Sequence, residues 1–149
     1  MHQLSEKILA RLPYSEPFRF VSGIVSINEN QIKGFHRFRT GDFFYQGHFT
    51  DDPVTPGVIL LETMGQIGLV TFGIYLFGLH ENELKFRPWL SWLESDFFKA
   101  VGPGEQVYVT ADKIYLRRNQ LKCRIEMTDV EGKTIVATKA TCTFEISQP

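Results

Sequence analysis

The chain has few of the residues from which metal centres and disulfide scaffolds are built. Only two of its 149 residues are cysteines, Cys123 and Cys142, and they stand neither in a Cys-x-x-Cys pair nor beside a cluster of histidines. A disulfide framework and a zinc site are therefore excluded, and we expect two reduced, buried thiols in a cytosolic protein. No Gly-rich phosphate loop follows a predicted strand, so we expect no metal and no cofactor.

A large charge of either sign is also absent. The formal net charge is −1, which argues against binding to nucleic acid, or to an anionic membrane, driven by overall charge. With 43% hydrophobic and 22% charged residues, and no linker or internal repeat, residues 1–149 are expected to form one globular domain. The first eight residues carry charges and no apolar signal core, so we predict a cytoplasmic protein.

One long hydrophobic run is present, from Ile59 to Leu79. It reaches about 20 residues, the length that crosses a bilayer, but it contains Glu62, Gln66 and several glycines. We therefore predict a buried helix over about 56–77, apolar on nearly all sides and enclosed by a sheet rather than inserted in a membrane. Close approach of neighbouring groups to this helix is expected at Gly65, Gly68 and Gly73.

The rest of the chain predicts shorter elements. Leu4, Ile8 and Leu12 recur at a spacing of four, which predicts an amphipathic helix closed by Pro13. Runs rich in β-branched and aromatic residues, bounded by turn residues, predict strands. These strands are expected over about 18–27, 31–40, 90–101, 106–116, 121–129 and 134–146. Together the elements predict an α+β fold, with an antiparallel sheet wrapped around one long central helix.

The chemistry is concentrated between His48 and Glu62. His48 lies in a turn-rich loop, and the following Thr-Pro-Gly predicts a helix start, with Thr55 as the cap and Pro56 at the first helical position. Glu62 then falls inside the helix among apolar residues, where a carboxyl group favours its neutral, proton-donating form. Histidine is the side chain best suited to accept a proton near neutral pH. The pair is therefore predicted to act as base and acid.

This stretch resembles the motif of the hot-dog-fold dehydratases that act on 3-hydroxyacyl chains carried by acyl carrier protein, the FabZ-like enzymes. The spacing between histidine and glutamate is the same, and nine positions match: His48, Phe49, Pro53, Val54, Pro56, Gly57, Val58, Glu62 and Gln66. Similar segments flank the motif, so that the likeness covers nearly the whole chain. They are Leu12-Pro13 with Pro17-Phe18, Phe43 to His48, Phe86 to Pro88 and Val101 to Glu105.

The resemblance implies dehydration to a trans-2-enoyl thioester in fatty acid, polyketide or polyene biosynthesis. His48 would remove the proton at C2, and Glu62 would protonate the departing hydroxyl group at C3. The N–H of Gly57 would bind the thioester oxygen, because the first amides of a helix have no internal partner. Gln66, one turn after Glu62, could hold that carboxyl group in position. Substrate contacts are expected at Gly57, Phe49, Val58 and Gln66.

The resemblance also implies partners. It implies a homodimer or larger homo-oligomer in which His48 of one subunit faces Glu62 of the other, and open sheet edges themselves tend to pair. Basic residues could meet an acidic acyl carrier protein, although each alone is more simply explained as solvated surface. These residues are Arg37, Arg39, Lys85, Arg87 and Lys99.

Three departures from the family pattern leave the substrate range open. Thr50-Asp51 replaces Pro-Gly after His-Phe, Tyr14-Ser15 replaces His-Arg, and the segment from Trp89 to Asp96 differs. Two alternatives therefore stand beside the dehydratase. One is a hot-dog thioesterase in which Glu62 activates water, although the His-Phe and Pro-Gly combination argues against it. The other is a non-catalytic acyl-binding module.

Overall fold

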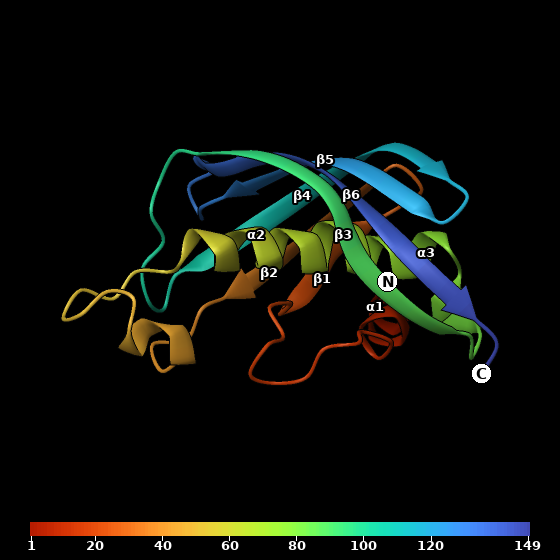
Figure 1. Cartoon of the computed structure of the whole chain (residues 1–149), viewed down its shortest axis with the longest axis horizontal. Coiled ribbons are helices and arrows are strands. Elements are labelled where there is room, and N and C mark those ends of the chain that lie inside the picture. The colour runs from red at the N-terminus through yellow and green to blue at the C-terminus, as the bar shows by residue number, and fades with distance from the viewer.

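The computed structural model describes the whole chain, and in it six antiparallel strands form one sheet that curves around a long helix (Figure 1). The strand order across the sheet is β1-β2-β4-β5-β6-β3. The strands are β1 Gly23–Ile27, β2 Gln31–Arg37, β3 Lys85–Phe97, β4 Gln106–Arg117, β5 Gln120–Thr128 and β6 Thr134–Ser147. The predicted α+β arrangement of one sheet around one helix is confirmed.

The central helix runs without interruption over Gly57–Leu76, as α2 Gly57–Gly65, the wider π-helical turns of η2 Gln66–Thr71, and α3 Phe72–Leu76. In η2 the buried hydroxyl of Thr71 donates to the carbonyl of Gln66, five residues earlier, at 2.7 Å. By length and composition the helix could cross a membrane, but 72% of its most apolar window is buried inside the protein. The prediction of a buried helix inside the sheet is confirmed.

The start of the central helix differs from the prediction. Pro56 is the cap residue and Gly57 the first helical residue, and no side chain bonds the first amides. Thr55 does not cap the helix because its hydroxyl is bonded to the buried Tyr45 hydroxyl at 2.6 Å. The N–H of Thr55 donates to the Val101 carbonyl at 2.8 Å. Thr55 therefore anchors the loop to its neighbours and leaves the helix amides free.

Two of the three helix glycines allow close approach as predicted. A Cβ added at Gly73 would lie 2.1 Å from the ring of Phe144 on β6, and one added at Gly68 would lie 3.1 Å from both Ala111 and Ile125. The prediction for Gly65 is wrong, because nothing lies within 4 Å of the corresponding position. Side-chain packing against the sheet therefore fixes the C-terminal half of the helix, whereas the surroundings of Gly65 are open.

The N-terminal segment is less regular than predicted. Helix α1 spans His2–Leu9 and ends before Leu12, and β1 begins at Gly23 rather than at about residue 18. Residues 18–20 make no ladder with a neighbouring strand because their backbone is bonded to the side chain of Gln66 on the central helix. A buried amide thus replaces the sheet as the partner of this segment.

Strand β3 begins earlier than predicted and lies at the edge of the sheet. It pairs with β6 from Lys85↔Ser147 to Phe97↔Val136, with one irregularity between Leu90 and Trp92. Pro88 is tolerated within it because an edge strand has one side without ladder hydrogen bonds. The other outer strand, β1, has only five residues, against 13 in β3. The longest unpaired backbone of the sheet is therefore that of β3.

Gly73→Ala should lower the free energy of unfolding by about 2 kcal/mol, because overpacking against the buried Phe144 ring outweighs the gain in helix propensity. Gly65→Ala is the matched control in the same helix, and it should keep or raise stability, since its new methyl group meets open space. Chemical denaturation of both variants measures the difference. Equal changes in the two variants would contradict this account of the helix packing.

Candidate active site

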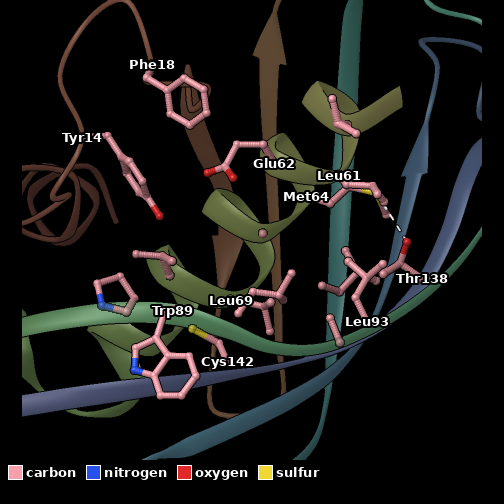
Figure 2. Close-up of a pocket in the computed structure, with 17 residues that line it drawn as sticks. Tyr14, Phe18, Leu61, Glu62, Met64, Leu69, Trp89, Leu93, Thr138 and Cys142 are labelled. Atoms are coloured by element: carbon pink, nitrogen blue, oxygen red, sulfur yellow. Dashed lines mark hydrogen bonds between the residues drawn. The ribbon is translucent and has the colours of Figure 1, made fainter. Parts of the chain in front are cut away.

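An apolar cavity of about 520 Å³ lies between the central helix, the N-terminal segment and strands β3, β5 and β6 (Figure 2). Most of its lining is hydrophobic. Leu61 and Leu69 come from the helix, Trp89 and Leu93 from β3, and Phe18 from the N-terminal segment. Glu62 provides the only charged group of the lining. The cavity therefore suits an apolar chain with one polar group placed near the carboxyl.

Glu62 is half-buried and is positioned by Gln66, as predicted. The Gln66 Nε2 donates to Oε2 of Glu62 at 2.9 Å and to the carbonyl of Phe18 at 3.0 Å, while its Oε1 accepts from the N–H of Phe20 at 2.7 Å. Gln66 is completely buried and is not part of the cavity lining. Its role is therefore to orient Glu62 from behind, and the expected direct contact with substrate has no support in the cavity.

His48 lies in the loop between η1, Phe43–Gln46, and the central helix. Its Nδ1 is 2.9 Å from the carbonyl oxygen of Val54, and the N–H of Val54 donates back to the His48 carbonyl at 2.9 Å. Because a carbonyl only accepts, Nδ1 carries the proton and Nε2 of the neutral ring is the basic nitrogen. The ring also stacks on that of Phe49, with 3.9 Å between the centroids.

One chain does not bring the predicted base and acid into a common cavity. The lining that includes Glu62 also includes Val58, but not His48, Phe49 or Gly57. The loop that carries His48 extends beyond the N-terminal end of α2, away from the sheet (Figure 1). The catalytic pair indicated by the sequence is therefore divided between the cavity and a projecting loop.

Gly57 occupies the position expected for an oxyanion-binding amide. It is the first residue of α2, so its N–H has no partner within the helix. A Cβ at this position would lie 3.2 Å from the Phe97 ring at the end of β3. Glycine therefore allows the helix start and the edge strand to approach closely.

The other histidines and cysteines show no arrangement for catalysis. His36 is buried, its Nδ1 is 3.0 Å from the hydroxyl of Ser22, and burial lowers its pKa to about 4. Both cysteines are free and buried, as predicted, and burial raises the pKa of Cys123 and of Cys142 to about 12. His36 is therefore a structural residue, and neither thiol ionises to a nucleophile near neutral pH.

Tyr14 lines the cavity beside Glu62 and was not identified as a site residue from the sequence. Burial, and to a smaller extent the charge of Glu62, raise the pKa of Tyr14 above its usual value. The only signal in the sequence is that Tyr14-Ser15 departs from the His-Arg of the resembled family. This departure does not by itself predict that the side chain faces the cavity.

Comparison with known proteins places these features in a family context. The FabA-like domain model matches residues 12–140. The 3-hydroxyacyl-[acyl-carrier-protein] dehydratase FabZ of Streptococcus suis is 32% identical over 142 residues, which cover 95% of this chain and 96% of that relative. The sequence likeness therefore extends over the N-terminal segment, the His48 loop, the central helix and the sheet.

Solved structures confirm the predicted hot-dog fold. The dehydratase heterocomplex ApeI:P of Xenorhabdus doucetiae matches with a TM-score of 0.74 at 14% identity, covering 95% of this chain and 90% of that one. A thioesterase of Haemophilus influenzae matches with a TM-score of 0.58 at 18% identity, covering 83% of this chain and 77% of that one. At such identities the structural likeness concerns the fold alone.

Gln66→Leu should lower the free energy of unfolding by about 2 kcal/mol, because it leaves the buried N–H of Phe20 and the part-buried carbonyl of Phe18 without their partner. Gln31→Leu is a matched control, since this exposed glutamine bonds Asp112 at 2.8 Å on the surface. Its effect should stay within about 0.5 kcal/mol. Urea denaturation measures both, and equal losses would show that the buried amide is not the anchor described above.

Proposed function

The chain belongs to the FabA-like family, and we propose from this membership that it dehydrates 3-hydroxyacyl chains carried by acyl carrier protein, with His48 as base and Glu62 as acid. The observation that carries the residue assignment is the placement of Glu62, the one carboxyl group on an apolar cavity, held there by Gln66. The cavity takes the acyl chain, and the carboxyl group meets the C3 hydroxyl.

The reaction follows from the properties of these groups. His48 Nε2 takes the proton from C2, and the electrons of the C2–H bond form the C2–C3 double bond. The C3–O bond breaks, and Glu62 gives its proton to the departing oxygen, so that water and a trans-2-enoyl thioester result. The free N–H of Gly57 bonds the thioester oxygen while negative charge develops on it.

We propose that the working unit is a dimer formed through the edge of β3. This strand exposes large apolar side chains, among them Trp89 (48% exposed), Leu90 (53%) and Trp92 (41%). A long, apolar, unpaired edge is unfavourable in water and tends to pair with another chain. Pairing with β3 of a second copy would give hydrogen-bond partners to the free backbone groups of this strand. It would also remove its apolar side chains from water.

The same contact explains the divided site. Trp89, Leu90 and Leu93 of β3 line the cavity, as does Val58, which is 72% exposed. A second chain on this edge would cover these residues and could bring its own His48 loop to Glu62. Each site would then take its base from one subunit and its acid from the other.

Acyl carrier protein is the proposed partner, and the basic residues expected to meet it differ in whether they already have an acidic partner. Arg39 is bonded to Glu16 at 2.7 Å, Arg87 is 3.3 Å from Glu145, and Lys99 is paired with Asp129. Of the five expected residues, Lys85 and Arg37 are in no ion pair, and Arg37 donates to the Gly104 carbonyl at 3.1 Å. These two are the better candidates for contact with an acidic carrier.

Mixing His48→Ala with Glu62→Gln subunits should restore activity, whereas each variant alone should lose about 10²–10⁴-fold in dehydration rate. In a shared-site dimer, random exchange makes about half of the dimers mixed, each with one complete site, which gives about a quarter of wild-type activity. The rate is measured as enoyl thioester formed from a 3-hydroxyacyl carrier protein.

The matched control mixes His48→Ala with the double variant His48→Ala/Glu62→Gln. No arrangement of these subunits contains a complete site, so this mixture should stay inactive. Subunit exchange is verified by mass spectrometry of differently tagged chains. Exchange without recovery in the first mixture would argue against a site shared between subunits.

The product should be the trans-2-enoyl thioester, with no appreciable cis-3 isomer. Related enzymes that also move the double bond carry Asp where this chain has Glu62, and a carboxyl group displaced by about 1 Å acts differently on the substrate carbons. Mass spectrometry of acyl carrier protein loaded with 3-hydroxyacyl chains detects loss of water, and chromatography of the released acyl groups separates the isomers. A free thiol in place of the enoyl product would indicate the thioesterase alternative, and binding without turnover the acyl-binding module.

A further inference from the structure

The cavity wall holds few polar groups, and most of them already have partners. Glu62 Oε2 accepts from Gln66, and the Thr138 hydroxyl is 2.6 Å from that of Ser95 and 3.8 Å from the sulfur of Met64. The remaining O–H group of the lining belongs to Tyr14. A ligand in the cavity would therefore find one uncommitted hydroxyl donor.

Tyr14 is held in a fixed relation to Glu62. It follows the buried Leu12 and packs against the hydrophobic core, although it belongs to no helix or strand. Four residues later the carbonyl of Phe18 is bonded to Gln66, the same side chain that holds Glu62. Figure 2 shows the side chains of Tyr14 and Glu62 entering the same end of the cavity from the N-terminal segment and from the helix.

We propose that the Tyr14 hydroxyl donates a hydrogen bond to the C3 oxygen of the bound 3-hydroxyacyl chain, and so selects and aligns the hydroxyl group that leaves. This inference rests on the proposed function. It adds a residue to the site that contacts the substrate next to the acid. Tyr14 also occupies a position at which this chain departs from the resembled family, which has histidine there.

The chemistry of the substrate leaves one position for this hydrogen bond. Near the reacting carbons a 3-hydroxyacyl thioester has two polar groups, its carbonyl and its C3 hydroxyl. The carbonyl is assigned to the Gly57 amide, and the hydroxyl lies beside Glu62. Tyr14 is next to Glu62, so its O–H is within reach of the C3 oxygen.

Tyr14 would act as a neutral donor throughout the reaction. As the C3–O bond breaks, the electron pair goes to the oxygen and the proton comes from Glu62. Tyr14 keeps its own proton, because its raised pKa maintains the phenol form over the working range of pH. A donor that stays in place stabilises the charge that develops on the oxygen before the proton arrives.

Tyr14→Phe keeps the ring and removes only the hydroxyl. We expect dehydration to slow by about tenfold or more, the loss that follows removal of one neutral hydrogen bond. The pH dependence of the rate should keep its shape, because a neutral phenol does not titrate there. Tyr75→Phe is the matched control, since Tyr75 lies on α3, stacks on His80 and is outside the cavity lining. It should retain the wild-type rate.

Binding separates this role from a structural one. In the Glu62→Gln background, which we expect to bind without turnover, the affinities for a 3-hydroxyacyl and a saturated acyl thioester of equal length are compared with and without Tyr14→Phe. Removal of the Tyr14 hydroxyl should lower the affinity for the 3-hydroxyacyl thioester by about tenfold and leave the affinity for the saturated thioester unchanged. Equal weakening of both ligands, or of neither, would overturn the assignment of Tyr14.

The two proposals fail in different ways. If the wild-type protein forms no enoyl product from any 3-hydroxyacyl carrier protein, the proposed function itself is wrong. If the wild-type protein dehydrates and Tyr14→Phe dehydrates equally fast, the proposed function stands and the role of Tyr14 is wrong. Thermal denaturation of Tyr14→Phe, expected close to wild type, ensures that the rate is compared between folded proteins.

Discussion

The buried side-chain amide of Gln66 joins the N-terminal segment, at residues 18–20, to the central helix and holds the carboxyl group of Glu62 at the cavity. A buried amide must find partners for both of its ends, so the N-terminal segment and the helix cannot shift independently without leaving polar groups unpaired. The cavity wall that contains Tyr14 and Phe18 therefore depends on the same residue that orients the carboxyl group of Glu62.

A second constraint comes from what one chain leaves uncovered. Side chains of β3 line the cavity, the edge of β3 exposes large apolar side chains, and His48 lies on a projecting loop outside the lining that holds Glu62. In an isolated chain the apolar edge of β3 is unfavourable in water, and the projecting His48 loop has no function at the cavity. A single contact with a second chain along the edge of β3 would explain both features, because it would cover the apolar side chains and complete the proposed catalytic pair.

Local sequence rules predicted most of the elements, since the central helix and the later strands have strong periodicity and clear turns. They failed where a distant side chain competes with the backbone. Thr55 was predicted to cap the helix, but its hydroxyl bonds that of Tyr45. Residues 18–20 were predicted to belong to a strand, but the carbonyl of Phe18 and the N–H of Phe20 bond the side chain of Gln66. The His48–Glu62 pair was predicted from its motif and stays a prediction, whereas the place of Tyr14 in the cavity lining was not predicted, because no local pattern says which irregular segment lines a cavity.

Gly73 packs closely against the ring of Phe144, and this contact also restricts rotation of the central helix about its own axis. Glu62 precedes Gly73 by 11 residues in the same uninterrupted helix, and the π-helical turns of η2 lie between them. A rotation of about 10° would carry a group at the helix surface sideways by about 1 Å, a displacement that can cost two orders of magnitude in rate. Gly73 therefore restricts the rotation of the helix that carries Glu62, the proposed acid, although Gly73 itself is not part of the cavity lining.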